Sequence, residues 1–104
     1  MLRVFISCPM NGLTDEEITK TRTDIKDKLS KTLASDFEIV DSFFTDFRVS
    51  GNSHIDPAMY YLGMAICKMA NSDIAVFAKG WDKARGCKME YEIARSYGKT
   101  IVIL

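Results

Sequence analysis

The sequence predicts an α/β domain built around a parallel β-sheet. Short apolar runs rich in branched and aromatic residues recur along the chain, and segments with helical spacing of apolar residues separate them. Polar loops containing Gly or Pro divide these segments. Strands that alternate with helices are joined by right-handed crossovers, which put helices on both faces of a parallel sheet. With 104 residues, residues 1–104 are expected to form a single domain around one core.

The first half of the chain predicts a strand, a helix and a second strand. Leu2–Ser7 is a short apolar run, typical of a buried parallel strand. Thr14 and Glu17 have the spacing of a capping box, so a helix should begin there and end near residue 34. Phe37–Asp41 is predicted as the next strand. One face of the helix carries Ile18, Arg22, Ile25, Leu29 and Leu33.

The second half opens with a long irregular stretch. Ser42–Pro57 has no clear period, and at this length we interpret it as a lid or binding loop. The remaining predicted elements are a helix over Ala58–Asn71, a strand over Asp73–Ala78, a helix that follows Gly86 and has Gly98 as its C-cap, and a buried strand over Thr100–Leu104. The last helix should turn one face inward, formed by Cys87, Glu90, Ile93, Ala94 and Tyr97.

This order of elements predicts a flavodoxin-like (Rossmann-like) three-layer sandwich, with a four-stranded parallel sheet in the order 2-1-3-4. In such open sheets, ligands bind outside the carboxyl ends of the strands, next to the point where the strand order reverses. The loops at that edge would be Cys8–Gly12, Ser42–Pro57 and Lys79–Gly86. We therefore expect the three least regular stretches of the chain to meet at one edge.

Composition excludes several classes of partner. The 14 basic and 14 acidic residues cancel, which argues against a nucleic-acid polymer or an anionic membrane surface as the main partner. No apolar run has membrane-spanning length and the N-terminal run is too short for a signal peptide, so we expect a cytoplasmic protein. Three cysteines without a CxxC pair, and a single histidine (His54), indicate neither a disulfide framework nor a metal site. No cofactor is expected.

Glu90 is the strongest candidate for a catalytic residue. Its register places it on the inward stripe of the last helix, where a carboxylate is costly unless it is paired or used. The alternative is a partly exposed residue whose aliphatic stem covers apolar surface. Glu92 falls on the opposite face and is expected in solvent.

Several motifs together resemble those of a known superfamily. These are Cys-Pro-Met-Asn-Gly after the first strand, Asp41 after the second and Asp73 opening the third. The last is Gly-Trp-x-x-Ala-Arg-Gly-Cys-x-x-Glu over residues 80–90, followed by Ala94 and Tyr97-Gly98. The chain resembles the nucleoside 2-deoxyribosyltransferase-like superfamily, in particular its short bacterial and phage domains of unknown function. In the characterised enzymes, a Glu four residues before an Ala in the helix after the third strand attacks C1′ of the deoxyribose. Glu90 matches that position.

The resemblance implies a hydrolase or deoxyribosyltransferase that acts on the N-glycosidic bond of a nucleoside or nucleotide. This sequence departs from the transferases at Ala65, where they carry an Asp eight residues before the residue equivalent to Asp73. The larger transferases also continue beyond a fourth strand, whereas this sequence ends at Leu104. The alternative is therefore a catalytically inactive module that binds a nucleotide or a nucleotide-derived signal in the same place.

The candidate substrate-binding residues lie in the loops at the carboxyl edge. The first loop would hydrogen-bond a sugar or phosphate, although a tight turn alone also explains its glycine. Trp81 would stack on a base, or instead fold over the edge of the core. Arg85 and Gly86 would hold an anion at a helix N-terminus, unless Arg85 pairs with Asp82 or Glu90. The full set is Ser7, Cys8, Pro9, Met10, Asn11, Gly12, Asp41, Gly80, Trp81, Arg85 and Gly86.

We also expect a homodimer or a higher homo-oligomer. Phe43, Phe44 and Phe47 and the helix start at Ala58–Tyr61 offer more aromatic surface than a solvated lid needs. Closed two-fold pairing is the commonest way to cover such a surface. The resemblance points the same way, because the transferases complete their sites across subunits.

Overall fold

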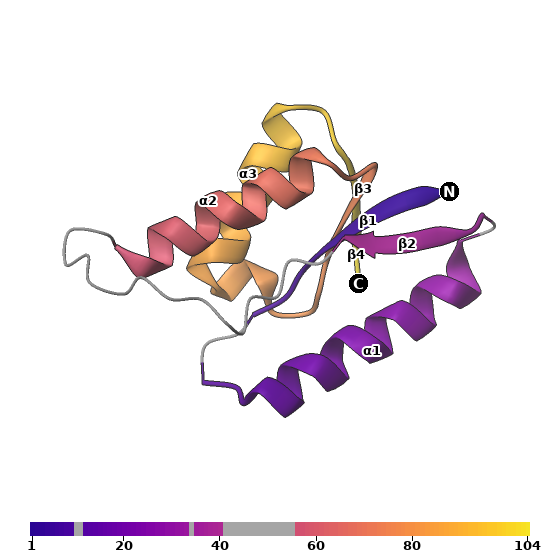
Figure 1. Cartoon of the computed structure of the whole chain (residues 1–104), viewed down its shortest axis with the longest axis horizontal. Helices are drawn as coiled ribbons and strands as arrows, with labels where there is room; N and C mark the ends of the chain where they lie inside the picture. Colours follow the sequence, from indigo (N-terminus) through magenta and orange to yellow (C-terminus); the bar gives the residue numbers. More distant parts are fainter. Residues whose placement is uncertain (10–11, 34, 41–55) are drawn as a thin grey trace.

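The computed structural model describes residues 1–9, 12–33, 35–40 and 56–104 (Figure 1). The elements are β1 (Leu2–Ser7), α1 (Asp15–Thr32), β2 (Phe37–Val40), α2 (Pro57–Ala70), β3 (Ile74–Phe77), a 3₁₀ turn η1 (Trp81–Lys83), α3 (Arg85–Ser96) and β4 (Thr100–Ile103). The predicted alternation of strands and helices is confirmed. The predicted loop, its three phenylalanines and His54 lie outside the described residues, apart from positions 56 and 57.

The four strands form one parallel sheet in the order β2-β1-β3-β4, as predicted. β1 is central, and its Val4 pairs with Ile39 of β2 on one side and with Ile74 of β3 on the other. At the carboxyl end of the sheet, Ser7 pairs with Phe77. The ends of β1 and β3 therefore lie side by side, at the point where the strand order reverses.

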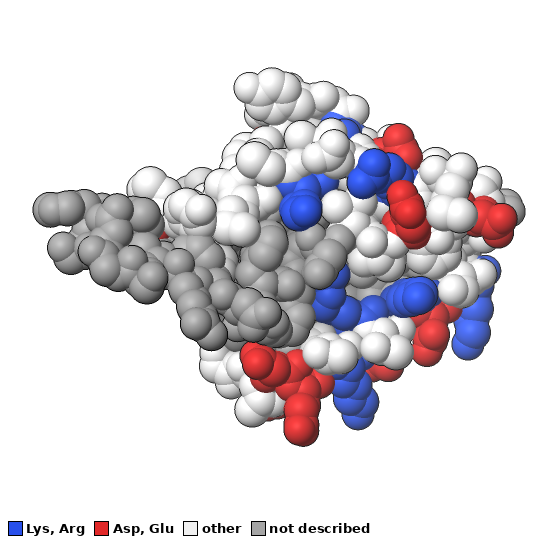
Figure 2. Space-filling model, in the orientation of Figure 1, with Lys and Arg blue, Asp and Glu red and all other residues white. Residues whose placement is uncertain are grey.

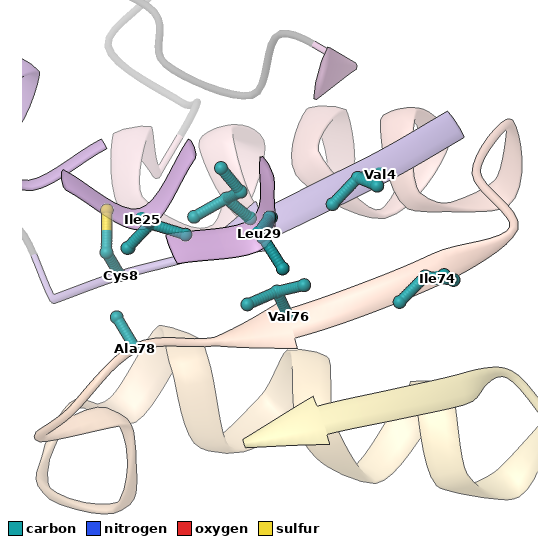
Figure 3. Packing of buried hydrophobic residues seen from close by; sticks show 8 residues of the cluster. Val4, Cys8, Ile25, Leu29, Ile74, Val76 and Ala78 are labelled. Atoms are coloured by element: carbon teal, nitrogen blue, oxygen red, sulfur yellow. The ribbon is translucent and has the colours of Figure 1, made fainter. Parts of the chain in front are cut away.

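Helices cover both faces of the sheet, which gives the predicted three layers (Figure 1). On one face, Val4 and Val76 pack with Ile25 and Leu29 of α1 in a cluster that includes Cys8 (Figure 3). Alternate strand residues point to opposite faces of a sheet. The neighbouring positions therefore pack on the other side, in a cluster formed by Phe5, Ala75, Phe77, Met69 of α2 and Ala94 of α3. Ser7 has the register of Phe5 and so belongs to the α2/α3 side.

Side-chain caps fix the starts of the two longer helices. The Glu17 backbone N–H donates to Thr14 Oγ1 at 3.1 Å, and the Thr14 N–H donates to Glu17 Oε1 at 3.3 Å, which confirms the capping box. The helix α1 ends at Thr32, slightly before the predicted end. Asp56 caps α2 through a 3.2 Å hydrogen bond from the Met59 N–H, so this helix begins at Pro57, one residue before the predicted start.

The end of the chain differs from the sequence prediction in two respects. β4 is not a buried strand, and Ile103 is 54% exposed, because β4 is an edge strand that pairs only with β3. Tyr97 is 84% exposed rather than inward, because α3 ends at Ser96. Gly98 then reverses the chain with a φ of 71°, and the Lys99 N–H donates to the Ala94 carbonyl at 2.9 Å.

None of the helices in the described part of the chain is both long and apolar enough to cross a membrane. Acidic and basic side chains are interspersed on the face shown in Figure 2, in keeping with the balanced charge of the sequence.

Candidate active site

A buried carboxyl group lies against the end of the central strand. Glu90, in the second turn of α3, is only 8% exposed, and the Ser7 hydroxyl donates to its Oε1 at 3.1 Å. Ser7 is the last residue of β1 and is itself buried. Cys87 and Ala94, a turn before and after Glu90, are buried on the same face of α3, so the inward register expected for Glu90 is present. The side chain therefore lies at the carboxyl edge of the sheet.

The environment of Glu90 changes its acidity. Burial raises the pKa of Glu90 from an ordinary 4.5 to about 7, and the hydrogen bond from Ser7 opposes that rise. The protonated and ionised forms are therefore both populated near neutral pH. Carboxyl groups with such pKa values occur at sites of acid–base and nucleophilic chemistry.

Two buried cysteines, Cys87 of α3 and Cys8 after β1, lie at this edge of the sheet. Burial raises the pKa of Cys87 to about 11, with Ser7 lowering it and the charges of Glu90 and Cys8 raising it. Burial likewise raises the pKa of Cys8, although the charge and hydrogen bond of Arg22 oppose this. Both are free thiols and are protonated at neutral pH, which makes them poor nucleophiles and poor metal ligands.

Arg22, on α1, lies close to Cys8. The sequence leaves open whether it extends towards solvent or pairs with a buried acid. In the structure it is half-buried and acts on Cys8 by charge and by a side-chain hydrogen bond. A cation therefore lies close to Cys8, on the α1 side of the sheet.

The loops that follow β1 and β3 pack against each other. Gly80 has a φ of 90°, and a Cβ atom there would lie 3.5 Å from Pro9 Cγ. The Ala78 N–H also donates to the Ser7 carbonyl at 2.9 Å. The expected convergence of these two loops is therefore present. Gly12 has a φ of 78° and is exposed. Three other predicted binding residues, Met10, Asn11 and Asp41, lie outside the described residues.

Trp81 is half-buried over the edge of the core. Its ring stacks on Tyr91 with centroids 4.4 Å apart and meets the edge of Phe77 at 5.7 Å. The core-covering interpretation therefore holds for one face of the indole. The sequence does not indicate that Tyr91 belongs to this site, because nothing in its ten-residue separation from Trp81 across η1 predicts that the two rings stack. Stacking of a base on the remaining surface of Trp81 stays a prediction.

Arg85 and Gly86 are the first two residues of α3, and both are exposed. The N-cap Ala84 has no side-chain acceptor, so N–H groups of the first turn have no side-chain cap. Among the residues that the structure describes, the only ion pair joins Arg3 and Glu38, so Arg85 pairs with neither Asp82 nor Glu90. The start of α3 is therefore exposed, and binding of an anion there stays a prediction.

Asp73 has a structural role at the opposite end of the sheet. Its Oδ2 accepts a hydrogen bond from the Arg3 N–H at 2.9 Å, and its own N–H donates to the Arg3 carbonyl at 2.7 Å. Within the described ranges, no group of three or more His, Cys, Asp or Glu residues is placed to hold a metal ion.

Fold and site together define an α/β domain with a flavodoxin-like sheet and a buried carboxyl group at its carboxyl edge. The chain belongs to the family described as "Domain of unknown function (DUF4406)", whose model matches residues 2–103. No curated protein matches the sequence.

Proposed function

We propose that this protein acts on the N-glycosidic bond of a nucleoside or nucleotide, as a hydrolase or deoxyribosyltransferase, with Glu90 as the nucleophile. One observation carries the proposal: a buried carboxyl group, held by Ser7, lies at the carboxyl end of the central strand. This edge is where open parallel sheets bind their ligands. The segment over residues 80–90 resembles the deoxyribosyltransferase-like superfamily, and this resemblance indicates that the bond to be cleaved is the N-glycosidic bond.

The chemistry requires Glu90 in its ionised form. One carboxylate oxygen attacks C1′ of the sugar, the C1′–N bond breaks, and the base leaves with the electron pair of that bond. The resulting glycosyl ester is then cleaved when water, or the nitrogen of another base, attacks C1′ and releases Glu90. Because the pKa of Glu90 is about 7, the ionised fraction and hence the rate should rise through neutral pH.

The exposed start of α3 is the proposed anchor for the substrate. Arg85 and Gly86 would take an anionic group of the substrate, and Trp81 would lie against its base. The partner is then a small nucleoside or nucleotide, and the chain is further expected to act as a homodimer.

A second function is favoured by one specific observation. Ala65 of α2, which stands where the transferases carry an Asp, is half-buried against the apolar cluster of Phe5 and Phe77 and supplies no acid. Without a proton donor, departure of the base is harder. The alternative is a catalytically inactive module that binds a nucleotide or a nucleotide-derived signal at the same edge.

The two functions are separated by measuring ligand binding and base release on the same samples. A panel of nucleosides and nucleoside monophosphates is screened by thermal shift, and each hit is then incubated with the protein and analysed for free base by chromatography. Enzyme function predicts free base from the wild type, a loss of roughly 10³-fold or more in Glu90→Gln, and little change in Glu92→Gln. Glu92 is an exposed residue of the same helix, which makes it a matched control.

Binding without base release would support the second function and reject the first. Base release by Glu90→Gln within a few-fold of the wild-type rate would show that Glu90 is not the nucleophile. Neither binding nor release across the panel would reject both functions for these ligands.

A further inference from the structure

The helix α2 is unlike the other two helices in charge. Pro57–Ala70 contains a single charged residue, Lys68, whereas more than half of the residues of α1 are charged. The side of α2 that faces the sheet is apolar, as expected from the core. The opposite side is also uncharged and carries Tyr60, Gly63, Met64 and Cys67, which we call the α2 face. A helix that is apolar on all sides is normally covered on all sides.

Three of the four residues of the α2 face are exposed in the single chain. Met69, on the sheet side, is the only residue in the described part of α2 that is buried. Tyr60 is 47% exposed, Gly63 and Cys67 are exposed, and Met64 is half-buried. A Cβ atom on Gly63 would have no atom within 4 Å, so the middle of the face is open.

We propose that the α2 face packs against the α2 face of a second copy of this chain, with the two helices antiparallel about a two-fold axis. Nucleic acid or another anionic partner would find only Lys68 to bind on this helix. A second copy offers the same uncharged surface, which is what an isologous interface requires. The proposal does not depend on the proposed activity of Glu90.

Charge at the ends of α2 favours the antiparallel direction. Asp56 caps its start and Lys68 stands in its last turn, so the two ends carry opposite charges. In antiparallel packing, Asp56 of each copy lies at the same end of the helix pair as Lys68 of the other copy. The two helix dipoles then also point in opposite directions, which is favourable. Parallel packing would bring like charges together. The midpoint between Asp56 and Lys68 lies at Leu62, next to Gly63, where the missing side chain allows the helices to approach closely.

The oligomeric state of the full chain tests the surface. Sedimentation equilibrium at micromolar concentration should give twice 11.7 kDa for the wild type. Met64→Glu places a charge in the interface and should raise the dissociation constant at least about 100-fold, whereas Ser30→Glu, on an exposed position of α1, should leave it unchanged. A wild-type species of 11.7 kDa would overturn the proposal. A dimer that Met64→Glu leaves intact would overturn the choice of surface.

Cross-linking tests the direction, and it does not depend on whether Met64→Glu folds. In a Cys67→Ser background, Gly63→Cys places a thiol beside the proposed two-fold axis. This thiol lies within reach of the Gly63→Cys thiol of the second copy. Mild oxidation with copper phenanthroline should give a disulfide-linked dimer, while Ser30→Cys in the same background should stay monomeric on a denaturing gel. Equal cross-linking of the two variants, or none at position 63, would reject antiparallel α2 packing. Sedimentation and cross-linking both measure the mass of the species present. Their results can therefore fail or succeed independently of the test for base release.

Discussion

Burial of Glu90 should make the stability of the fold depend on pH in a defined direction. Its pKa is about 7 in the folded protein and 4.5 when it is exposed, a difference of about 2.5. At 1.36 kcal/mol per pKa unit, this corresponds to about 3 kcal/mol. Between pH 4.5 and 7 the folded state keeps the proton and the unfolded state loses it. The contribution of Glu90 to stability is therefore lost as pH rises through this window, and the cost stays constant above it.

Replacing Glu90 with Gln removes this titration and keeps an oxygen that accepts the Ser7 hydrogen bond. Urea unfolding of wild type and variant, followed by circular dichroism, gives the difference in unfolding free energy at about pH 4.5 and about pH 8. We expect the variant to gain about 3 kcal/mol over the wild type between the two values. With an m-value of about 2 kcal/mol/M, the difference in urea midpoint should change by about 1.5 M. Other titrating groups contribute equally to both proteins and cancel.

Glu92→Gln is the matched control, because Glu92 is exposed on the other side of the same helix. Its stability difference from the wild type should not change with pH. If Glu90→Gln behaves in the same way, Glu90 ionises as it would in water, and the account of its burial fails.

Three further results are expected. Ser7→Ala removes the hydrogen bond that lowers the pKa of Glu90. The rising part of the pH profile for base release should therefore move to higher pH. An unchanged profile would show that Ser7 does not act on Glu90. In dilute samples, below the concentration at which the proposed dimer forms, iodoacetamide should modify Cys67, which is exposed in the single chain, well before Cys87, which is buried with a pKa of about 11. Peptide mass spectrometry measures the order, and faster modification of Cys87 would contradict its burial. Gly98→Ala should destabilise the fold by about 1 kcal/mol in urea, because Gly98 has a φ of 71°; equal stability would mean that the turn tolerates a side chain.

The order and type of the elements were predictable because local patterns carry them. The boundaries of β1 and the capping box at Thr14 follow from residues within one turn of each other. The exposure of β4 and Tyr97 was not predictable in this way. An apolar strand such as β4 is buried only if other elements cover it, and its edge position emerges from the assembled sheet. Whether the side chain of Tyr97 points inward depends on the residue at which α3 ends and the chain turns away from the helix axis.

The candidate site was predictable in position and only partly in detail. The inward register of Glu90 follows from helical spacing, and the parallel topology brings the end of β1 to it. That Ser7 would donate directly to Glu90, 83 residues away, has no signal in the sequence. The stacking of Trp81 on Tyr91 is equally hidden, because it depends on how η1 aims the indole. The spacing of residues along a single helix is a local property, whereas contacts between elements depend on the final packing.

The central place of β1 bears on how the chain must fold. Val4 finds its first neighbour, Ile39, 35 residues later, and its second, Ile74, 70 residues later. At synthesis rates of roughly 5–20 residues per second, the edge of β1 that will meet β3 waits roughly 4–14 seconds for its partner to be made. During that time a strand of apolar residues has an unpaired edge, which is open to association with other chains. Long-range parallel pairing also slows folding, so the pairing of β3 with β1 is the expected slow step.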